Sequence, residues 1–505
     1  MIFSLIHLIP FLVSTVELSS QFIFPKGLPC KVYNRTRLDC YNRTLTSIPP
    51  LKDDNIKSLD LSLNQLEAVN GISLTNLDQL EELNLSHNSV SNISFDTNLP
   101  LRVLDLSYNK IRNINADTFT LNKLETLDLS HQSHPLTLHA SAFHSATSLK
   151  NLTIANSGLT SLPPLVFSGL HELQELYIGQ NSIESLPTSV FHGLASLTHL
   201  DVRYDVLRSL PAVLFQDLTS LEHLDLSSNT ISSFVMPEIT ETLLANLKYL
   251  DLSWNVLIST LPETLFVNLI SLEYLDLSVN SLSNLSETLF VNLTNLKYLD
   301  ISTNYISSLP DTLFANLMHL TYLDITVNWL TSIPCKAIEG LQMLRTLAIY
   351  YNKYDYVPCP LVNMTSLKEL HASYSTDQQG TKYWNETEYW NETEYWNETK
   401  WSELITRLPA SLSTLYLEVY TESVFQSVTA GSYLNSSLTS LDILYLNDLS
   451  IEDDAFSMFP YLQTLSIYNF FYRNPIALSK YAFRSLSHLK SLNLSRNGLT
   501  YQISL

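Results

Sequence analysis

Two columns of side chains that could bind a partner recur about every 24 residues in the middle of the chain. The acidic column consists of Asp201, Asp225, Asp251, Asp276, Asp300 and Asp324. The aromatic column, two residues earlier in each copy, consists of His199, His223, Tyr249, Tyr274, Tyr298 and Tyr322. Such regular spacing indicates that each column lies along one line of a repetitive structure.

The chemistry of the two columns favours a binding patch. Carboxylates stacked about 5 Å apart in water repel one another by up to about 1 kcal/mol per pair before salt screening. A cationic partner would relieve this repulsion, and the tyrosines would supply rigid amphipathic contact area. The alternative is that Leu-Asp-Leu-Ser is simply the ordinary consensus of the repeat and serves no ligand.

The sequence contains no recognisable catalytic constellation. The histidines are scattered, and there is no Gly-rich phosphate loop, His-Glu-x-x-His metal motif or Gly-x-Ser-x-Gly elbow. We therefore predict a protein that is not an enzyme and that needs no cofactor or metal.

The overall charge narrows the class of partner. The 505 residues carry a formal net charge of −21, and no long run of Lys and Arg interrupts the acidic character. Such a field repels phosphate backbones, so nucleic acid is not expected as a partner. A basic protein or a neutral glycan fits the charge better.

A repeated sequence, Leu-x-x-Leu-x-Leu-x-x-Asn-x-Leu, positions both columns. Clear copies begin at Leu80, Leu101, Leu124, Leu173, Leu221, Leu247, Leu272, Leu296, Leu320 and Leu489. Weaker copies begin at Ile56, Leu149, Leu197, Leu344, Leu367, Leu412, Leu441 and Leu462. Within Leu247–Leu252 the leucines alternate with Tyr249 and Asp251, which is typical of a short strand with one buried face.

Two further columns complete the expected core. A buried asparagine ends most strands, where its amide can satisfy backbone groups of the turn: Asn64, Asn88, Asn109, Asn181, Asn229, Asn255, Asn280, Asn304, Asn328, Asn352 and Asn497. A phenylalanine fills the return limb: Phe119, Phe143, Phe167, Phe191, Phe215, Phe266, Phe290, Phe314 and Phe483. Strands pack closer than these limbs, so the array must curve with the sheet inside.

Repeats of this period and signature predict a leucine-rich-repeat horseshoe. The expected fold is an α/β-type solenoid with a parallel β-sheet on the concave face and loops or short helical turns on the convex face.

The N-terminal region is predicted to contain a signal peptide and a cap. Residues 1–13 form an apolar run of signal-peptide length, and residues 1–19 are assigned to a signal peptide; a short membrane anchor or a buried strand is the alternative. Residues 20–52 would cap the first repeat. Cys30 and Cys40 lie in this cap, and in a secreted chain we expect them to form a disulfide, with two free thiols as the alternative.

A second pair of cysteines, Cys335 and Cys359, occupies the same slot in consecutive repeats. Stacked strands lie about 4.8 Å apart, within the range of Cα separations that a disulfide spans. We therefore expect a disulfide between neighbouring return limbs; two unpaired thiols facing solvent are the alternative.

The repeats divide into three stretches. Residues 53–375 are regular, 376–411 form an insertion with three Tyr-Trp-Asn-Glu-Thr repeats, and 412–505 are irregular. The insertion is predicted to be a glycosylated loop, although a replication-slippage expansion without function is the alternative. Leu449 and Phe470 replace the strand-ending asparagine in the last stretch, and the chain stops inside a repeat at Leu505. We expect a truncated product or fragment, which would meet a membrane only through a missing C-terminal segment; a short secreted form is the alternative.

Glycosylation sequons are numerous, as expected for an extracellular chain. They lie at Asn34, Asn42, Asn84, Asn92, Asn151, Asn284, Asn292, Asn363, Asn385, Asn391, Asn397, Asn435 and Asn493. None falls in the strands between Leu197 and Ile325, so the patch should be free of sugar.

The consensus Leu-x-x-Leu-x-Leu-x-x-Asn-x-Leu, with its later Pro and Phe-x-x-Leu, resembles the typical extracellular leucine-rich-repeat family from Cys30 to Leu499. The two-cysteine cap and the regular and irregular stretches are similar to a Toll-like receptor ectodomain without its C-terminal cap, membrane span and signalling domain. The resemblance implies an innate immune receptor module, secreted or at the cell surface, that binds a protein or glycan ligand and forms a homodimer. Matrix or adhesion proteins of the same family are nearly as similar and supply the alternative function.

Overall fold

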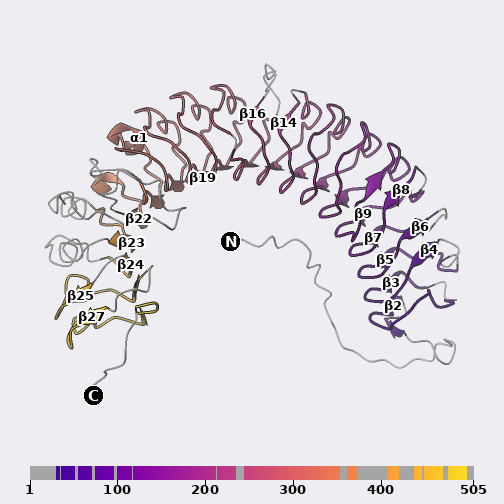
Figure 1. The fold of residues 1–505 in the computed structure, drawn as a ribbon, viewed down its shortest axis with the longest axis horizontal. Helices are drawn as coiled ribbons and strands as arrows, with labels where there is room; N and C mark the ends of the chain where they lie inside the picture. Colours follow the sequence, from indigo (N-terminus) through magenta and orange to yellow (C-terminus); the bar gives the residue numbers. More distant parts are fainter. Residues whose placement is uncertain are drawn as a thin grey trace, which may run out of the picture.

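The structure is a computed structural model in which the following residues are described: 30–34, 36–51, 55–70, 74, 76–95, 99–116, 118–211, 213–234, 244–256, 258–352, 361–373, 408–419, 437–445, 449–469 and 476–497. They form an arch whose strands line the inner, concave side and whose outer side consists mainly of turns and loops (Figure 1). The predicted horseshoe solenoid is confirmed.

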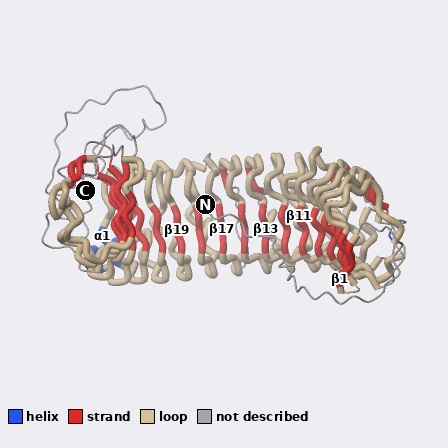
Figure 2. Tube along the Cα trace, turned by 90° about the horizontal axis from the view of Figure 1, so that it is seen from below, coloured by secondary structure: helices blue, strands red, loops and turns tan. Residues whose placement is uncertain are grey.

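One 20-stranded sheet runs along the inner side of the arch. Its strands are β1 (Lys31–Tyr33), β2 (Arg37–Asp39), β3 (Ser58–Asp60), β5 (Glu82–Asn84), β7 (Val103–Asp105), β9 (Thr126–Asp128), β11 (Asn151–Thr153), β12 (Glu175–Tyr177), β13 (His199–Asp201), β15 (His223–Asp225), β17 (Tyr249–Asp251), β18 (Tyr274–Asp276), β19 (Tyr298–Asp300), β20 (Tyr322–Asp324), β21 (Thr346–Ala348), β22 (Glu369–Ser373), β23 (Thr414–Val419), β24 (Ser440–Tyr445), β26 (Thr464–Asn469) and β28 (Ser491–Asn493). The pair β1–β2 is antiparallel, and from β2 onward neighbouring strands are parallel. The strands lie side by side along the length of the arch (Figure 2).

The leucines of each repeat pack against those of the next repeat. Leu247, Leu250 and Leu252 are buried, whereas Lys248 between them is exposed. Leu250 pairs in register with Leu275 of the following strand. A shift of one residue would move the whole apolar set to the concave face, so burial fixes the register.

The strand-ending asparagines form the predicted ladder. The Nδ2 group of Asn304 donates to the carbonyls of Ile301, Ser302 and Leu277, at 3.2, 3.0 and 3.0 Å, and its Oδ1 accepts from the Leu282 amide at 3.0 Å. The residue before the asparagine turns the chain in a left-handed conformation, with φ of 54° at Thr303. The amide thus joins its own turn to the neighbouring repeats without leaving buried polar atoms unpaired.

Phenylalanine side chains stack on the return limb, as predicted. The ring of Phe290 is 6.1 Å from Phe266 and 6.3 Å from Phe314, and its exposed fraction is 0%. Phe95 and Phe456 extend the column beyond the predicted members. These separations exceed the strand spacing of about 4.8 Å, so each repeat is a wedge and the stack curves toward the sheet.

The outer side carries short secondary structure. Small parallel pairs are formed by β4 (Ala68–Asn70) with β6 (Asn92–Ser94), β8 (Asn113–Ile114) with β10 (Thr137–Leu138), β14 (Ser209–Leu210) with β16 (Ser233–Phe234), and β25 (Ser450–Ile451) with β27 (Ala477–Leu478). The helical turns are α1 (Cys335–Glu339) and a 3-10 turn at Leu361–Asn363. Within the described ranges, no helix has the length and apolar character needed to cross a bilayer.

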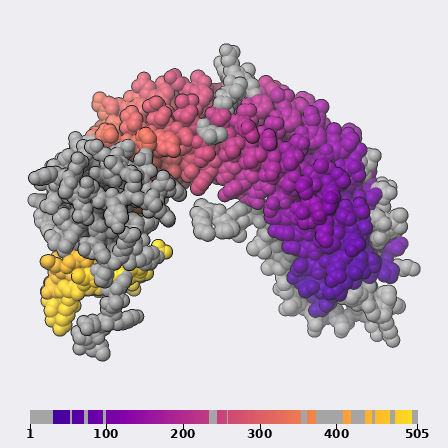
Figure 3. All heavy atoms as spheres, in the orientation of Figure 1, coloured from indigo at the N-terminus to yellow at the C-terminus, as the bar shows by residue number. Residues whose placement is uncertain are grey.

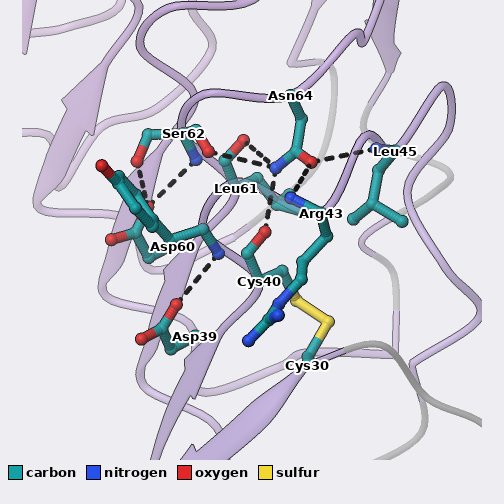
Figure 4. Close-up of a disulfide and its surroundings, with 10 residues drawn as sticks. Cys30, Asp39, Cys40, Arg43, Leu45, Asp60, Leu61, Ser62 and Asn64 are labelled. Atoms are coloured by element: carbon teal, nitrogen blue, oxygen red, sulfur yellow. Dashed lines mark hydrogen bonds between the residues drawn. A yellow bond between two sulfur atoms is a disulfide. The ribbon is translucent and has the colours of Figure 1, made fainter.

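A disulfide between Cys30 and Cys40 closes the N-terminal cap, which confirms the predicted pair. Asn64 of the first repeat docks the cap, because its Oδ1 accepts from the amides of Arg43 and Leu45 while its Nδ2 donates to the Cys40 carbonyl (Figure 4). Cys335 is also disulfide-bonded, and Cys359, its predicted partner, lies outside the described residues.

One repeat start was predicted wrongly. In the sheet, Leu441 pairs with Leu415, so the repeat begins at Leu438 and not at Leu441. Leu438, Leu441 and Ile443 supply the buried column, and Leu449 is therefore a buried core residue outside the asparagine slot. A run rich in apolar residues fits the pattern in two registers, and only pairing with β23 selects one.

Several sequence predictions fall outside the described residues: the signal peptide at 1–19, the tyrosine-tryptophan insertion, the asparagine slot at Phe470 and the chain end at Leu505. The boundaries proposed for the three stretches stay predictions.

Candidate binding surface

The aromatic column is a continuous ladder of stacked rings across six neighbouring strands, β13, β15, β17, β18, β19 and β20. Ring centroids are 5.3 Å apart for His199–His223, 3.9 Å for His223–Tyr249 and 4.3 to 4.4 Å along Tyr249, Tyr274, Tyr298 and Tyr322. Interplanar angles within the tyrosine part are 5° to 9°. Each inner ring has both faces covered, so a ligand on the concave side would meet ring edges and hydroxyls.

The acidic column lies beside this ladder and is hydrogen-bonded to it. The hydroxyls of Tyr249, Tyr274, Tyr298 and Tyr322 donate to Oδ2 of the aspartate two residues later, at 3.2 to 3.5 Å. The other carboxyl oxygen accepts a backbone N–H two residues further on, as Asp300 does from Ser302 at 2.8 Å. The two predicted columns therefore form one connected polar surface.

Burial changes the expected electrostatics of the aspartates. They are half-buried or buried, with exposed fractions of only 8% at Asp201 and 5% at Asp225, whereas the sequence argument treated them as hydrated. Burial and the neighbouring carboxylates raise the pKa of Asp251 and of Asp300 to about 7. Burial, together with the charge of Asp225, raises the pKa of Asp201 to about 6. Proton uptake and tyrosine hydroxyls thus relieve repulsion that the sequence argument assigned to a cationic ligand.

Burial also shifts the pKa values of other aspartates in the acidic column and of a histidine in the aromatic column. Burial raises the pKa of Asp276 and Asp324 above the ordinary aspartate value. Burial lowers the pKa of His223 to about 4, with the nearby His199 and Arg203 acting in the same direction. His223 is therefore neutral at physiological pH and packs as an aromatic ring.

We expect the thermal stability of the protein to fall as the pH rises from about 5 to 8. Aspartates whose folded-state pKa is raised bind more protons when folded, so their stabilising effect is present at low pH and is lost as the pH passes through about 6 to 7. His223 and His131 act oppositely, since their lowered pKa values cost stability below about pH 6.5. These two groups are outnumbered by six aspartates with raised pKa values: Asp201, Asp205, Asp251, Asp276, Asp300 and Asp324. The expected loss of melting temperature is several degrees between pH 5.5 and 8.5, measured by circular dichroism in one buffer series.

Asp300→Asn is the matched variant for this pH dependence, with both proteins made in cells that attach no N-glycans because the substitution creates an Asn-Ile-Ser sequon. Asn84 occupies the equivalent slot and accepts the Ser86 amide at 2.9 Å, so asparagine keeps the backbone bond without an ionisable group. The variant should show a weaker pH dependence than the wild type. An unchanged slope would contradict the assignment of this carboxyl.

Arg203 closes the N-terminal end of the patch. Its guanidinium lies 3.2 Å from Oδ2 of Asp201 and 3.6 Å from Oδ2 of Asp225, in the slot where most repeats carry serine. The preceding repeat has Gly179 there, and a Cβ at Gly179 would approach the Arg203 carbonyl oxygen to 2.5 Å. A side chain at position 179 would therefore clash with the backbone of Arg203.

A second aromatic cluster, absent from the sequence prediction, lies on β21 to β26 beyond the ladder. Tyr350 is 6.0 Å from Tyr416, His371 is 5.6 Å from Tyr416, and the Tyr468 hydroxyl donates to the Tyr416 hydroxyl at 3.3 Å. These residues occupy two different slots of the repeat, His371 and Tyr416 one and Tyr350 and Tyr468 the other, so no single sequence column contains them. Counting aromatic residues per repeat, instead of per slot, would have found them.

The sequons inside the described ranges differ in accessibility. Asn34, Asn42, Asn92, Asn284, Asn363 and Asn493 are exposed, whereas Asn84, Asn151 and Asn292 are half-buried. Nδ2 of Asn292 donates to the Val267 carbonyl at 2.7 Å. Asn385, Asn391, Asn397 and Asn435 lie outside the described residues. Glycosylation at these positions stays a prediction.

No cluster of three or more potential metal ligands occurs among the residues with described positions. In the space-filling view the repeats surround an open hollow on the concave side of the arch (Figure 3). The ladder strands line the middle of the inner rim (Figure 1).

Comparison with known proteins agrees with this architecture. A family model described as a leucine-rich repeat region matches residues 240–502, more than half of the chain. Two further leucine-rich repeat models match residues 147–207 and 202–257, and residues 97–114.

Among characterised proteins, osteomodulin of Rattus norvegicus is 27% identical over 161 residues, which cover 32% of this chain and 31% of the relative. Osteomodulin of Bos taurus is 33% identical over 87 residues, or 17% of this chain and 19% of the relative. The chain thus spans about a third or less of the length of these relatives.

Among solved structures, the Toll–Spatzle complex, described as a hub in Drosophila development and innate immunity, contains a chain that is 20% identical to this one. The match covers 82% of this chain and 51% of that chain, with a TM-score of 0.53. That likeness confirms the Toll-like resemblance at the level of fold. The chain belongs to the leucine-rich-repeat family.

Proposed function

We propose that this protein is a non-enzymatic extracellular recognition module that binds a basic protein or peptide on the concave patch formed by the aromatic and acidic columns. The observation that carries the proposal is the unbroken six-ring ladder with its hydrogen-bonded aspartates. Aromatic side chains held rigid by stacking lose little conformational entropy on binding, and tyrosine is enriched among residues that dominate interface energies.

Charge around the patch supports a basic ligand. Lys248 and Lys297 at its edge are paired with Glu222 and Glu273, at 2.9 and 2.7 Å, so they do not oppose an incoming cation. Above pH 7 the aspartates of the column ionise, and they then contribute in full to the formal net charge of −21. Complementary charge raises the association rate and selects against acidic partners.

Selection from a random peptide library displayed on phage, at pH 8, tests this proposal. Enriched peptides should be rich in Lys and Arg, and Tyr274→Ala/Tyr298→Ala should weaken their binding at least about tenfold, which corresponds to 1.4 kcal/mol. The matched control is Tyr33→Ala/Tyr41→Ala, which removes two exposed tyrosines of the N-terminal cap. Peptides without a basic bias, or with equal affinity for both variants, would refute the patch.

Two biological settings fit such a module. A Toll-like innate immune receptor, in which a ligand-bound ectodomain forms a homodimer, is supported by the shared fold. A matrix or adhesion role is supported by the matches to osteomodulin. Sequencing the full transcript past the codon for Leu505 distinguishes them: a membrane span and a cytoplasmic domain favour the receptor, and a stop codon favours the secreted protein.

A further inference from the structure

The asparagine ladder contains one position with an unusual chemical problem. Gln132 and Ser157 replace asparagine elsewhere in the ladder, and both are neutral hydrogen-bond donors. Nε2 of Gln132 donates to the Leu106 carbonyl at 3.0 Å. The hydroxyl of Ser157 donates to the Leu129 carbonyl at 2.9 Å. Asp205 occupies the same slot in the repeat that begins at Leu197. An ionised carboxylate has no proton to donate, so it cannot perform the function of the amide.

The surroundings of Asp205 are those of a ladder asparagine. Its exposed fraction is 5%, and its Oδ1 accepts the Ile183 amide at 2.9 Å. The same amide–carbonyl bond is made by Asn304 to Leu282 at 3.0 Å. Asp205 therefore keeps the acceptor role of the asparagine side chain.

The other carboxyl oxygen is buried and unpaired. Oδ2 of Asp205 has no hydrogen-bond partner among the described residues. In the next repeat the corresponding atom is Nδ2 of Asn229, which donates to the carbonyls of Val202, Leu226 and Ser227. By the equivalence of repeats, Oδ2 of Asp205 faces carbonyl oxygens. Oxygen facing oxygen is unfavourable unless one of them carries a proton.

We propose that Asp205 is held as a neutral carboxylic acid in the folded protein, with Oδ2–H donating to a ladder carbonyl, and that its ionisation loosens the joint between the repeats beginning at Leu173 and Leu197. The joint is thus a pH-sensitive element built into the solenoid. It lies at the N-terminal margin of the concave patch, because Asp205 follows β13, the first strand of the ladder.

The pKa of Asp205 agrees with this assignment. Burial raises it to about 7; hydrogen bonds from the backbone amides of Ile183 and Asn181 oppose the shift, and the charge of Asp201 adds to it. The acid is therefore mostly neutral at pH 5 and mostly ionised at pH 8.

Neighbouring charges do not remove the need for a proton. The ionisable groups on β13, just after it and on the two strands beside it are His199, Asp201, Arg203, Glu175, Tyr177, His223 and Asp225. The one permanent cation, Arg203, is engaged by Asp201 and Asp225. His223 is neutral above about pH 4, and the charge of Asp201 favours protonation of Asp205.

Hydrogen exchange of the full chain, followed by mass spectrometry from pH 5 to pH 8.5 and corrected for intrinsic exchange chemistry, tests the proposal. In the wild type, opening of the segment 178–207 should become more favourable by up to about tenfold per pH unit through the range in which Asp205 titrates. Asp205→Asn restores the ladder consensus, so its exchange in this segment should be slower at pH 8.5 and should depend less on pH than in the wild type, with the titration of Asp201 remaining. Its melting temperature should exceed that of the wild type by several degrees at pH 8.5 and by much less at pH 5.

Two further variants make the test specific. Asn304→Asp should install a similar pH dependence in its own repeat, far from Asp205. Asp78→Asn makes the same change of charge at an exposed position and should leave both segments as in the wild type. Equal pH dependence of segment 178–207 in the wild type and in Asp205→Asn would overturn the proposal. Because the difference between these two proteins is compared at each pH, the concave aspartates do not confound the result.

Discussion

Replacing Phe290 with alanine should lower the free energy of unfolding by about 3–5 kcal/mol. Its ring has an exposed fraction of 0% and is stacked between Phe266 and Phe314, so truncation leaves a cavity that neither neighbour can fill without moving its own repeat. The loss should appear in urea denaturation followed by circular dichroism.

The adjacent Val291 provides the control. Its exposed fraction is 42%, so Val291→Ala should change stability by no more than about 0.5 kcal/mol. Similar losses in the two variants would mean that the phenylalanine column is not the structural spine of the return limb. A loss limited to the repeats around Phe290 would indicate that the solenoid unfolds in sections, as nearest-neighbour arrays can.

Removing the cap disulfide with Cys30→Ala/Cys40→Ala should cost about 2–3 kcal/mol, since closing a loop of this length restricts the unfolded chain by that amount. Cys40 is fully buried and its carbonyl accepts from Asn64, so the change also weakens the contact that covers the first repeat. Hydrogen exchange should accelerate in the N-terminal repeats.

The spatial extent of that acceleration is the informative result. Contacts in the array join each repeat to its neighbours, so repeats around Leu296 should exchange as in the wild type. Uniform acceleration along the chain would show that the cap stabilises the solenoid as a whole and would contradict a nearest-neighbour description.

The backbone arrangement was predictable because the spacing of the leucines shows which side chains must be buried. Leu247, Leu250 and Leu252 must face one side of a strand whatever their partners, and repetition places each strand against the next. The register around Leu441 was not predictable, because leucines three residues apart satisfy the pattern in two ways. The register is set by pairing with the neighbouring strand in the folded protein, and a single sequence does not show that pairing.

The arrangement of the side chains in the candidate patch was predictable, but their burial and protonation were not. Identical slots placed Tyr274 beside Tyr298 and Asp276 beside Asp300 correctly. Sequence spacing carries no information on how deeply a concave carboxylate is buried, so the aspartates were treated as hydrated and the raised pKa values were missed. Asp205 did carry a readable signal, since an acid stood where the repeat requires an amide.

The in-register tyrosines have a consequence for how such a surface changes over generations. Tyr274, Tyr298 and Tyr322 occupy the same place in successive repeats and meet through near-identical stacking, at 4.3 and 4.4 Å. Duplicating the coding segment for one such unit would add one ring and one carboxyl to the columns while reproducing the junctions on either side. Recombination can therefore lengthen or shorten the columns by whole repeats. The surface could then fit a longer or shorter partner without any change in the contacts between repeats.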